Sequence, residues 1–156
     1  MNSAALNGTG LTIGIVRARW NDQIVDRLAE GVSRRLADLK VTKTVEVSVP
    51  GCSEIPLAAK YLADSGEIDA IVCIGAVIEG QSTRSEMISR DCGRGVQQVQ
   101  LSTGVPVLLG LLAVEDHDQA LAQSEGPGGH NAGEVAAASA VEMARLAQKW
   151  APFSDC

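Results

Sequence analysis

The chain has 156 residues, a length typical of one domain, and 46% of them are hydrophobic but only 3% aromatic, so the core must be built from Ala, Val, Leu and Ile. A formal net charge of -6 disfavours binding to the phosphate backbone of nucleic acids. No stretch approaches the roughly 20 apolar residues of a membrane span, and the N-terminus lacks the pattern of a secretory signal, which predicts a cytoplasmic protein without a membrane partner.

Apolar runs and helical periodicities alternate along the chain. After a mobile segment at 1–10, we expect a strand at 11–18, a helix at 23–39, a strand at 45–49, a helix at 54–64, a strand at 68–74, a helix at 85–99, a strand at 105–112, a helix at 115–124, a glycine-rich loop at 126–133 and a helix at 134–150. Such alternation predicts an α/β fold, a three-layer α/β/α sandwich with a mainly four-stranded parallel sheet. Residues 11–150 are expected to form a single domain, followed by a tail at 151–156.

The chain lacks the motifs of several common metal and nucleotide sites. The four cysteines form no CxxC pair, and His117 and His130 are the only histidines, so we expect reduced structural thiols and no metal. The loop GPGGHNAG lies between helices, whereas a dinucleotide fingerprint follows a strand. We therefore expect no dinucleotide site in this loop.

Three segments follow the ends of predicted strands, where open α/β sheets bind ligands. Trp20 either stacks on a flat heterocycle or packs against the next helix. Ser53 and Glu54 either face a ligand or only cap a helix. In the glycine-bracketed loop at 75–82, backbone amides can hold an anion.

The motifs VPGCSEIP, GAVIEG, GVPVLLGLL and GPGGHNAG, together with VEM in the last helix, resemble lumazine synthase over nearly the whole chain. The segments ARWN and GGHN look most like fungal members of that family. The resemblance implies flavodoxin-like topology and a cofactor-free condensation of 5-amino-6-ribitylamino-uracil with 3,4-dihydroxy-2-butanone 4-phosphate, in riboflavin biosynthesis. It also implies a homopentamer, which closes into an icosahedral shell in some members, with sites between subunits.

The resemblance also assigns site residues. Trp20 falls where the family stacks an aromatic on the pyrimidine, and Asn21 beside it is a further expected substrate-binding residue. Ser53, Glu54 and Ile55 fall at the ribityl chain, and the backbone of Ala76, Val77 and Ile78 at the pyrimidine. The remaining expected substrate-binding residues are Gln81 and Ser82 in the phosphate loop, Leu109 in place of an aromatic from a neighbouring subunit, Gln123 and His130.

The departures from the family pattern lie at the expected catalytic and phosphate-binding positions. The catalytic histidine is replaced by Arg84, the following aromatic by Ser85, a basic residue by Glu79 and the phosphate-binding arginine by Gln123. Arginine is always charged and is no general base near neutral pH. Arg84 instead supplies a positive charge for the phosphate, while Glu79 opposes an anion.

Three functions follow as alternatives. The first is a lumazine synthase of the transferase type, with reduced activity. The second is a non-catalytic paralogue that binds a ribityl-pyrimidine or a flavin, and the third is an oligomeric structural or shell protein. Arg84 and Gln123 count against the first, whereas Trp20 and Glu54 count against the third.

Overall fold

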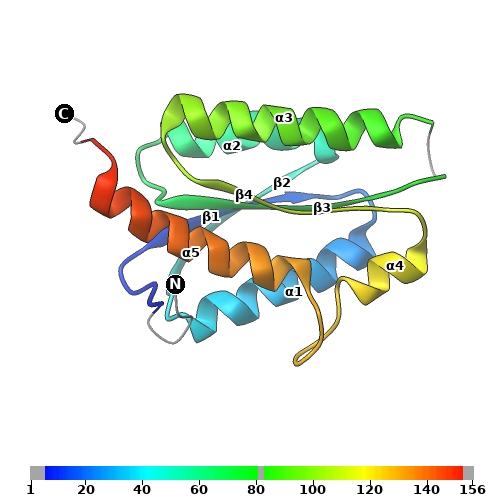
Figure 1. Ribbon diagram of the computed structural model, residues 1–156, viewed down its shortest axis with the longest axis horizontal. Helices are drawn as coiled ribbons and strands as arrows, with labels where there is room; N and C mark the ends of the chain where they lie inside the picture. Colours follow the sequence, from blue (N-terminus) through cyan, green and yellow to red (C-terminus); the bar gives the residue numbers. More distant parts are fainter. Residues whose placement is uncertain (1–5, 81–82, 153–156) are drawn as a thin grey trace.

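A computed structural model describes residues 6–80 and 83–152. Its sheet contains four strands in the order β2-β1-β3-β4, and every adjacent pair is parallel (Figure 1). The strands are β1 (Thr12–Ala18), β2 (Lys43–Val49), β3 (Ala70–Ile78) and β4 (Val107–Val114). The predicted α/β fold class with a four-stranded parallel sheet is confirmed.

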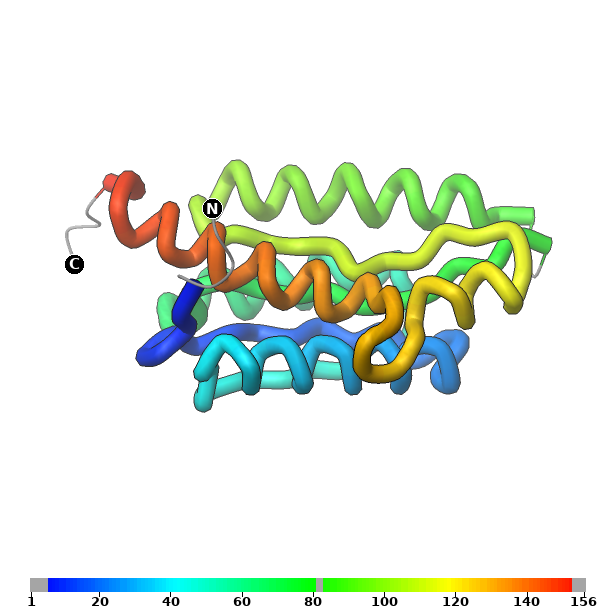
Figure 2. Tube along the Cα trace, turned by 60° about the horizontal axis from the view of Figure 1, so that its bottom comes forward, coloured from blue at the N-terminus to red at the C-terminus, as the bar shows by residue number. Residues whose placement is uncertain are grey.

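Helices cover both faces of the sheet. The helices are α1 (Asp22–Asp38), α2 (Ile55–Asp64), α3 (Ser85–Thr103), α4 (His117–Ala122) and α5 (Ala132–Trp150), with a 3₁₀ turn η2 (Cys52–Glu54) before α2. Figure 1 shows α2 and α3 above the sheet and α1, α4 and α5 below it, and Figure 2 shows α1 and α5 side by side. Among the described residues, no helix is both long and apolar enough to cross a membrane.

Two elements differ from their predicted bounds in a way that matters for the site. β3 runs through Ile78, whereas the sequence predicted a loop from Gly75. The four extra residues pair with β4, from Gly75 opposite Leu111 to Ile78 opposite Val114, and this pairing overrides the glycine signal. The helix predicted from Glu54 begins as the 3₁₀ turn and becomes α-helical only at Ile55.

The core forms two layers, one on each face of the sheet. β3 is buried along its whole length, as expected for the inner strand of a parallel sheet. Its side chains alternate: Val72, Ile74 and Ala76 join the layer under α1 and α5, while Ile71 and Cys73 join the layer under α2 and α3.

Residues 6–10 contact the domain, although the domain boundary at residue 11 stays a prediction. Leu6 packs against the core, and the Gly8 amide donates to the Leu39 carbonyl at 2.6 Å. Arg145 on α5 donates to the carbonyls of Asn7 and Thr9, both at 2.9 Å.

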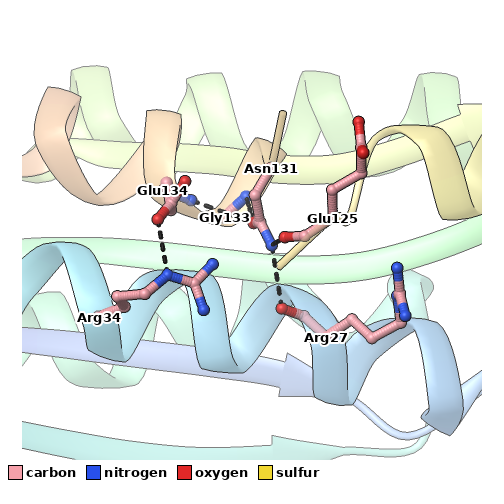
Figure 3. Close-up of polar contacts among 6 residues, drawn as sticks. All are labelled: Arg27, Arg34, Glu125, Asn131, Gly133 and Glu134. Atoms are coloured by element: carbon pink, nitrogen blue, oxygen red, sulfur yellow. Dashed lines mark hydrogen bonds and ion pairs between the residues drawn. The ribbon is translucent and has the colours of Figure 1, made fainter. Parts of the chain in front are cut away.

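Asn131 joins α1, α5 and the loop between α4 and α5 (Figure 3). Its side chain is buried; Nδ2 donates to the carbonyls of Arg27 (3.1 Å) and Glu125 (2.9 Å). Its Oδ1 accepts from the amides of Gly133 (2.8 Å) and Glu134 (3.3 Å), which caps α5. All four hydrogen-bonding positions of this buried amide are therefore used.

Two glycines let α1 and α5 approach closely at Asn131. A Cβ atom on Gly133 would lie 2.2 Å from the Leu28 carbonyl oxygen, and one on Gly31 would lie 2.2 Å from Asn131 Oδ1. An ion pair between Arg34 Nε and Glu134 Oε1, at 2.8 Å, closes the same interface.

Replacing Gly133 with alanine should destabilise the protein, because the new methyl group meets backbone that cannot rotate away. We expect Gly133→Ala to lower the free energy of unfolding by about 1–3 kcal/mol. Gly93→Ala is the control: nothing lies within 4 Å of its Cβ position inside α3, so it should stabilise by roughly 0.5–1 kcal/mol. Urea denaturation at one protein concentration measures both, and equal stability of the two variants would contradict the close-approach argument.

Candidate active site at the carboxyl ends of β1 and β3

The strand order creates a crevice between β1 and β3. From β1 the chain crosses through α1, below the sheet, to β2; from β3 it crosses through α3, above the sheet, to β4 on the other side (Figure 1). Two neighbouring strands whose connections leave in opposite directions leave an open space beyond their carboxyl ends. The structure thus provides a binding position before any side chain is considered.

A cavity of about 270 Å³ occupies this crevice. One wall is the end of β3 and another is Trp20, which follows β1 and is 63% exposed, so a ligand can reach its ring. The described lining residues are Trp20, Gly51, Cys52, Ser53, Ala76, Val77, Ile78, Arg84, Ser85 and Ile88. A mainly apolar slot with few polar groups suits a flat heterocycle.

The turn at 51–54 is held against β3 by a close contact. A Cβ atom on Gly75 would lie 2.8 Å from Cys52 Sγ, so the absence of a side chain at Gly75 lets the turn approach the strand. The Glu54 carboxylate accepts a hydrogen bond from the Gly51 amide at 3.0 Å. Glu54 therefore closes its own turn, and Ser53 lines the cavity.

Asn21 connects the ends of β1 and β3. It has left-handed backbone conformation (φ 59°) at the start of α1, and its Nδ2 donates to the Ala76 carbonyl at 2.8 Å. Its side chain makes no hydrogen bond that caps α1. It orients the backbone that forms the cavity wall.

The thiols near the cavity are not nucleophiles. Cys52, Cys73 and Cys92 are buried free cysteines. Burial raises the pKa of Cys52 to about 12, with smaller contributions from Cys92 and Glu54, and burial raises the pKa of Cys92 to about 11. Burial likewise raises the pKa of Cys73. A protonated thiol is a weak nucleophile, so Cys52 acts as a small apolar part of the wall.

The structure brings together six of the predicted site residues at this cavity: Trp20, Ser53, Ala76, Val77, Ile78 and Arg84. Asn21 lies behind them through its bond to Ala76. Ile55 is completely buried and does not line the cavity. Gln81 and Ser82 lie outside the described residues.

Leu109, Gln123 and His130 do not line the cavity of their own chain. Leu109 is exposed on β4, at the opposite edge of the sheet from β2. Gln123 ends α4, and His130 is exposed in the glycine-rich loop.

Sequence reasoning missed Gly51, Cys52 and Ile88 as lining residues and named Ser85 only as a substitution. Cys52 had a usable signal, since it adjoins Ser53 in the same turn. Ile88 lies one helical turn after Arg84, and its amide bonds to the Arg84 carbonyl at 2.9 Å.

A parallel α/β domain with an apolar slot at its switch point belongs to the small-molecule-binding α/β proteins. Residues 10–148 match the model of the family described as 6,7-dimethyl-8-ribityllumazine synthase. Relatives with that name are 41% identical in Paraburkholderia phymatum (91% of this chain, 81% of the relative) and 38% in Bordetella petrii (96% and 84%). Another, from Cupriavidus metallidurans, is 41% identical (90% and 82%).

The chain therefore belongs to the 6,7-dimethyl-8-ribityllumazine synthase family. This confirms the family resemblance of the sequence motifs, whereas the likeness to fungal members stays a prediction.

Proposed function

We propose that the protein is a transferase that condenses 5-amino-6-ribitylamino-uracil with 3,4-dihydroxy-2-butanone 4-phosphate to give 6,7-dimethyl-8-ribityllumazine, without a cofactor and in the cytoplasm. The observation that carries this proposal is the cavity at the ends of β1 and β3, where an accessible Trp20 faces the backbone of Ala76, Val77 and Ile78. Family membership supplies the reaction. In this proposal the pyrimidine stacks on Trp20.

Arg84 differs from a histidine at this position in its charge and in its ability to transfer a proton. It is the only charged residue among the described lining residues of the cavity. Its guanidinium binds the phosphate of the sugar substrate through charge-assisted hydrogen bonds, in place of the arginine position now held by Gln123. The guanidinium stays protonated near neutral pH, so it does not supply general acid–base catalysis, which is worth ~10²–10⁴ in rate.

Turnover in this proposal rests on holding the two substrates together. Proximity and orientation alone can supply about 7–11 kcal/mol of the barrier. We therefore expect a slow enzyme rather than an inert one. The same Arg84 and Gln123 favour a second candidate, a paralogue that binds a ribityl-pyrimidine or a flavin at Trp20 without turnover.

Apolar side chains at both edges of the sheet support a homo-oligomer, and we propose a pentamer. Leu57 and Tyr61 of α2 are exposed beside edge strand β2, and Leu109 is exposed on the other edge, β4. Different surfaces that meet head to tail close into a ring. In such a ring Leu109, Gln123 and His130 of one copy complete the site of the next, and pentamers can further assemble into a shell.

Light scattering tests the assembly. We expect a mass near five times the 16.2 kDa of the chain, or a multiple of that for a shell. Tyr61→Glu should lower the mass, because it places a charge in an apolar interface. Lys60→Glu introduces the same group on another side of α2 and should leave the mass unchanged. A stable monomer of the wild type would contradict the proposal.

Trp20→Ala should weaken the binding of 5-amino-6-ribitylamino-uracil. Ring stacking contributes about 0.5–1.5 kcal/mol beyond the area buried. Isothermal titration calorimetry measures the dissociation constant, and Trp150→Ala, an exposed tryptophan at the end of α5, is the matched control. An unchanged dissociation constant in Trp20→Ala would remove the stacking role.

Arg84 decides between the enzyme and the binding protein. In the enzyme, Arg84→Ala should raise KM for the sugar phosphate roughly tenfold or more, the value of a hydrogen bond to a charged group. Arg90→Ala removes the same charge from the same helix outside the cavity and should leave KM unchanged.

The double variant Arg84→His with Gln123→Arg restores a proton carrier and a phosphate clamp, so its kcat should exceed that of the wild type. Formation of the lumazine, followed by its absorbance, measures all variants. Wild-type kinetics in Arg84→Ala would show that Arg84 has another role. If no variant turns over although each folds and binds 5-amino-6-ribitylamino-uracil, the result would support the binding protein.

A further inference from the structure

A second cavity, of about 500 Å³, adjoins the ring cavity, which is the cavity of about 270 Å³ already described. It lies between the start of α3, the end of β4 and the start of α4. Its described lining residues are Val77, Glu79, Ser85, Glu86, Ser89, Ala113, Val114, Glu115 and Gln119. Val77 and Ser85 line both cavities, so they form the wall between them.

Ser85 makes this wall thin. It is the first residue of α3 and is only 6% exposed, and its hydroxyl donates to the Ile78 carbonyl at 3.5 Å. Serine has a single heavy atom beyond Cβ, so a larger side chain at this position would fill space that both cavities share. The size of residue 85 therefore controls how far a ligand in the ring cavity can extend.

The two cavities differ in charge. The ring cavity contains Arg84, whereas the described lining of the second contains the carboxylates of Glu79, Glu86 and Glu115 and neither lysine nor arginine. Carboxylates accept hydrogen bonds from hydroxyl groups and repel phosphate. A phosphate is therefore favoured on the Arg84 side and disfavoured beyond Ser85.

We propose that Ser85 is a specificity-determining residue, which lets a heterocycle in the ring cavity extend an uncharged, hydroxyl-bearing substituent into the second cavity, from which a phosphate is excluded. This substituent belongs to another position of the ring than the ribityl chain expected at Ser53 and Ile55. The inference rests on the proposed function for the occupant of the ring cavity.

The test compares 8-ribityllumazines that differ in one substituent: methyl, 3-hydroxypropyl, or the phosphate ester of the latter, each attached at position 6 or at position 7. Calorimetry measures their dissociation constants. For the wild type we expect the better hydroxypropyl isomer to bind at least as tightly as the methyl compound. Its phosphate ester should bind at least about tenfold more weakly, since juxtaposed like charges are strongly unfavourable.

Two variants close the second cavity. Ser85→Phe fills the shared wall, and Ala113→Phe fills the second cavity from β4 without lining the ring cavity. Each should weaken hydroxypropyl binding by roughly tenfold or more, as misfits of a few atoms do, while the methyl compound changes far less in Ala113→Phe. Ser102→Phe, the same substitution at an exposed position of α3, should change neither ligand. Circular dichroism verifies folding and light scattering verifies an unchanged assembly, because Ala113 is exposed on β4, the strand that also contains Leu109.

The inference would be overturned if the hydroxypropyl compound bound both Ser85→Phe and Ala113→Phe as tightly as the wild type. It would also be overturned if the wild type bound the hydroxypropyl compound and its phosphate ester equally tightly. The proposed function survives either result if the methyl compound binds and Trp20→Ala weakens it. Failure of the methyl compound to bind the wild type would reject the ring site and, with it, both proposals.

Discussion

The fully buried strand β3 is the constraint on which the site depends. It pairs with β1 only up to Ile74, opposite Arg17, but it continues to Ile78 along β4. The step between the two strand ends leaves room for a ligand, and the alternating side chains of the extension supply walls on both faces of the sheet. Val77, on the α2 and α3 side, consequently lines both cavities.

Small residues position the rest of the site around this strand. Gly75 admits Cys52 and thereby the turn that contains Ser53, while Gly31 and Gly133 admit the close packing of α1 and α5 around Asn131. Each glycine weakens its element through backbone entropy, and each is offset here by a contact that a methyl group would prevent. In a chain with 3% aromatic residues, such close backbone approach replaces the filling of space by large rings.

Arg84 and Ser85, neighbours in the chain, give the two cavities different properties on one scaffold. Arg84 provides charge without proton transfer, and Ser85 provides space beside it. The three carboxylates beyond Ser85 and the guanidinium before it give the two cavities linings of opposite charge. A fold alone is compatible with many reactions, and the side chains at the site decide among them.

The sequence by itself determined the order of strands and helices, the parallel sheet and the family, and it led to the prediction that Arg84 and Gln123 depart from the family pattern. These follow from local periodicity and from motifs that can be aligned residue by residue. Only the tertiary structure decided that Gly75–Ile78 is strand, that Glu54 bonds to Gly51, that Ile55 is buried and that Ser85 divides two cavities. Each of these depends on which segments lie side by side in the sheet and its covering layers, and pairing between segments distant in the chain is not encoded in the local pattern of either one.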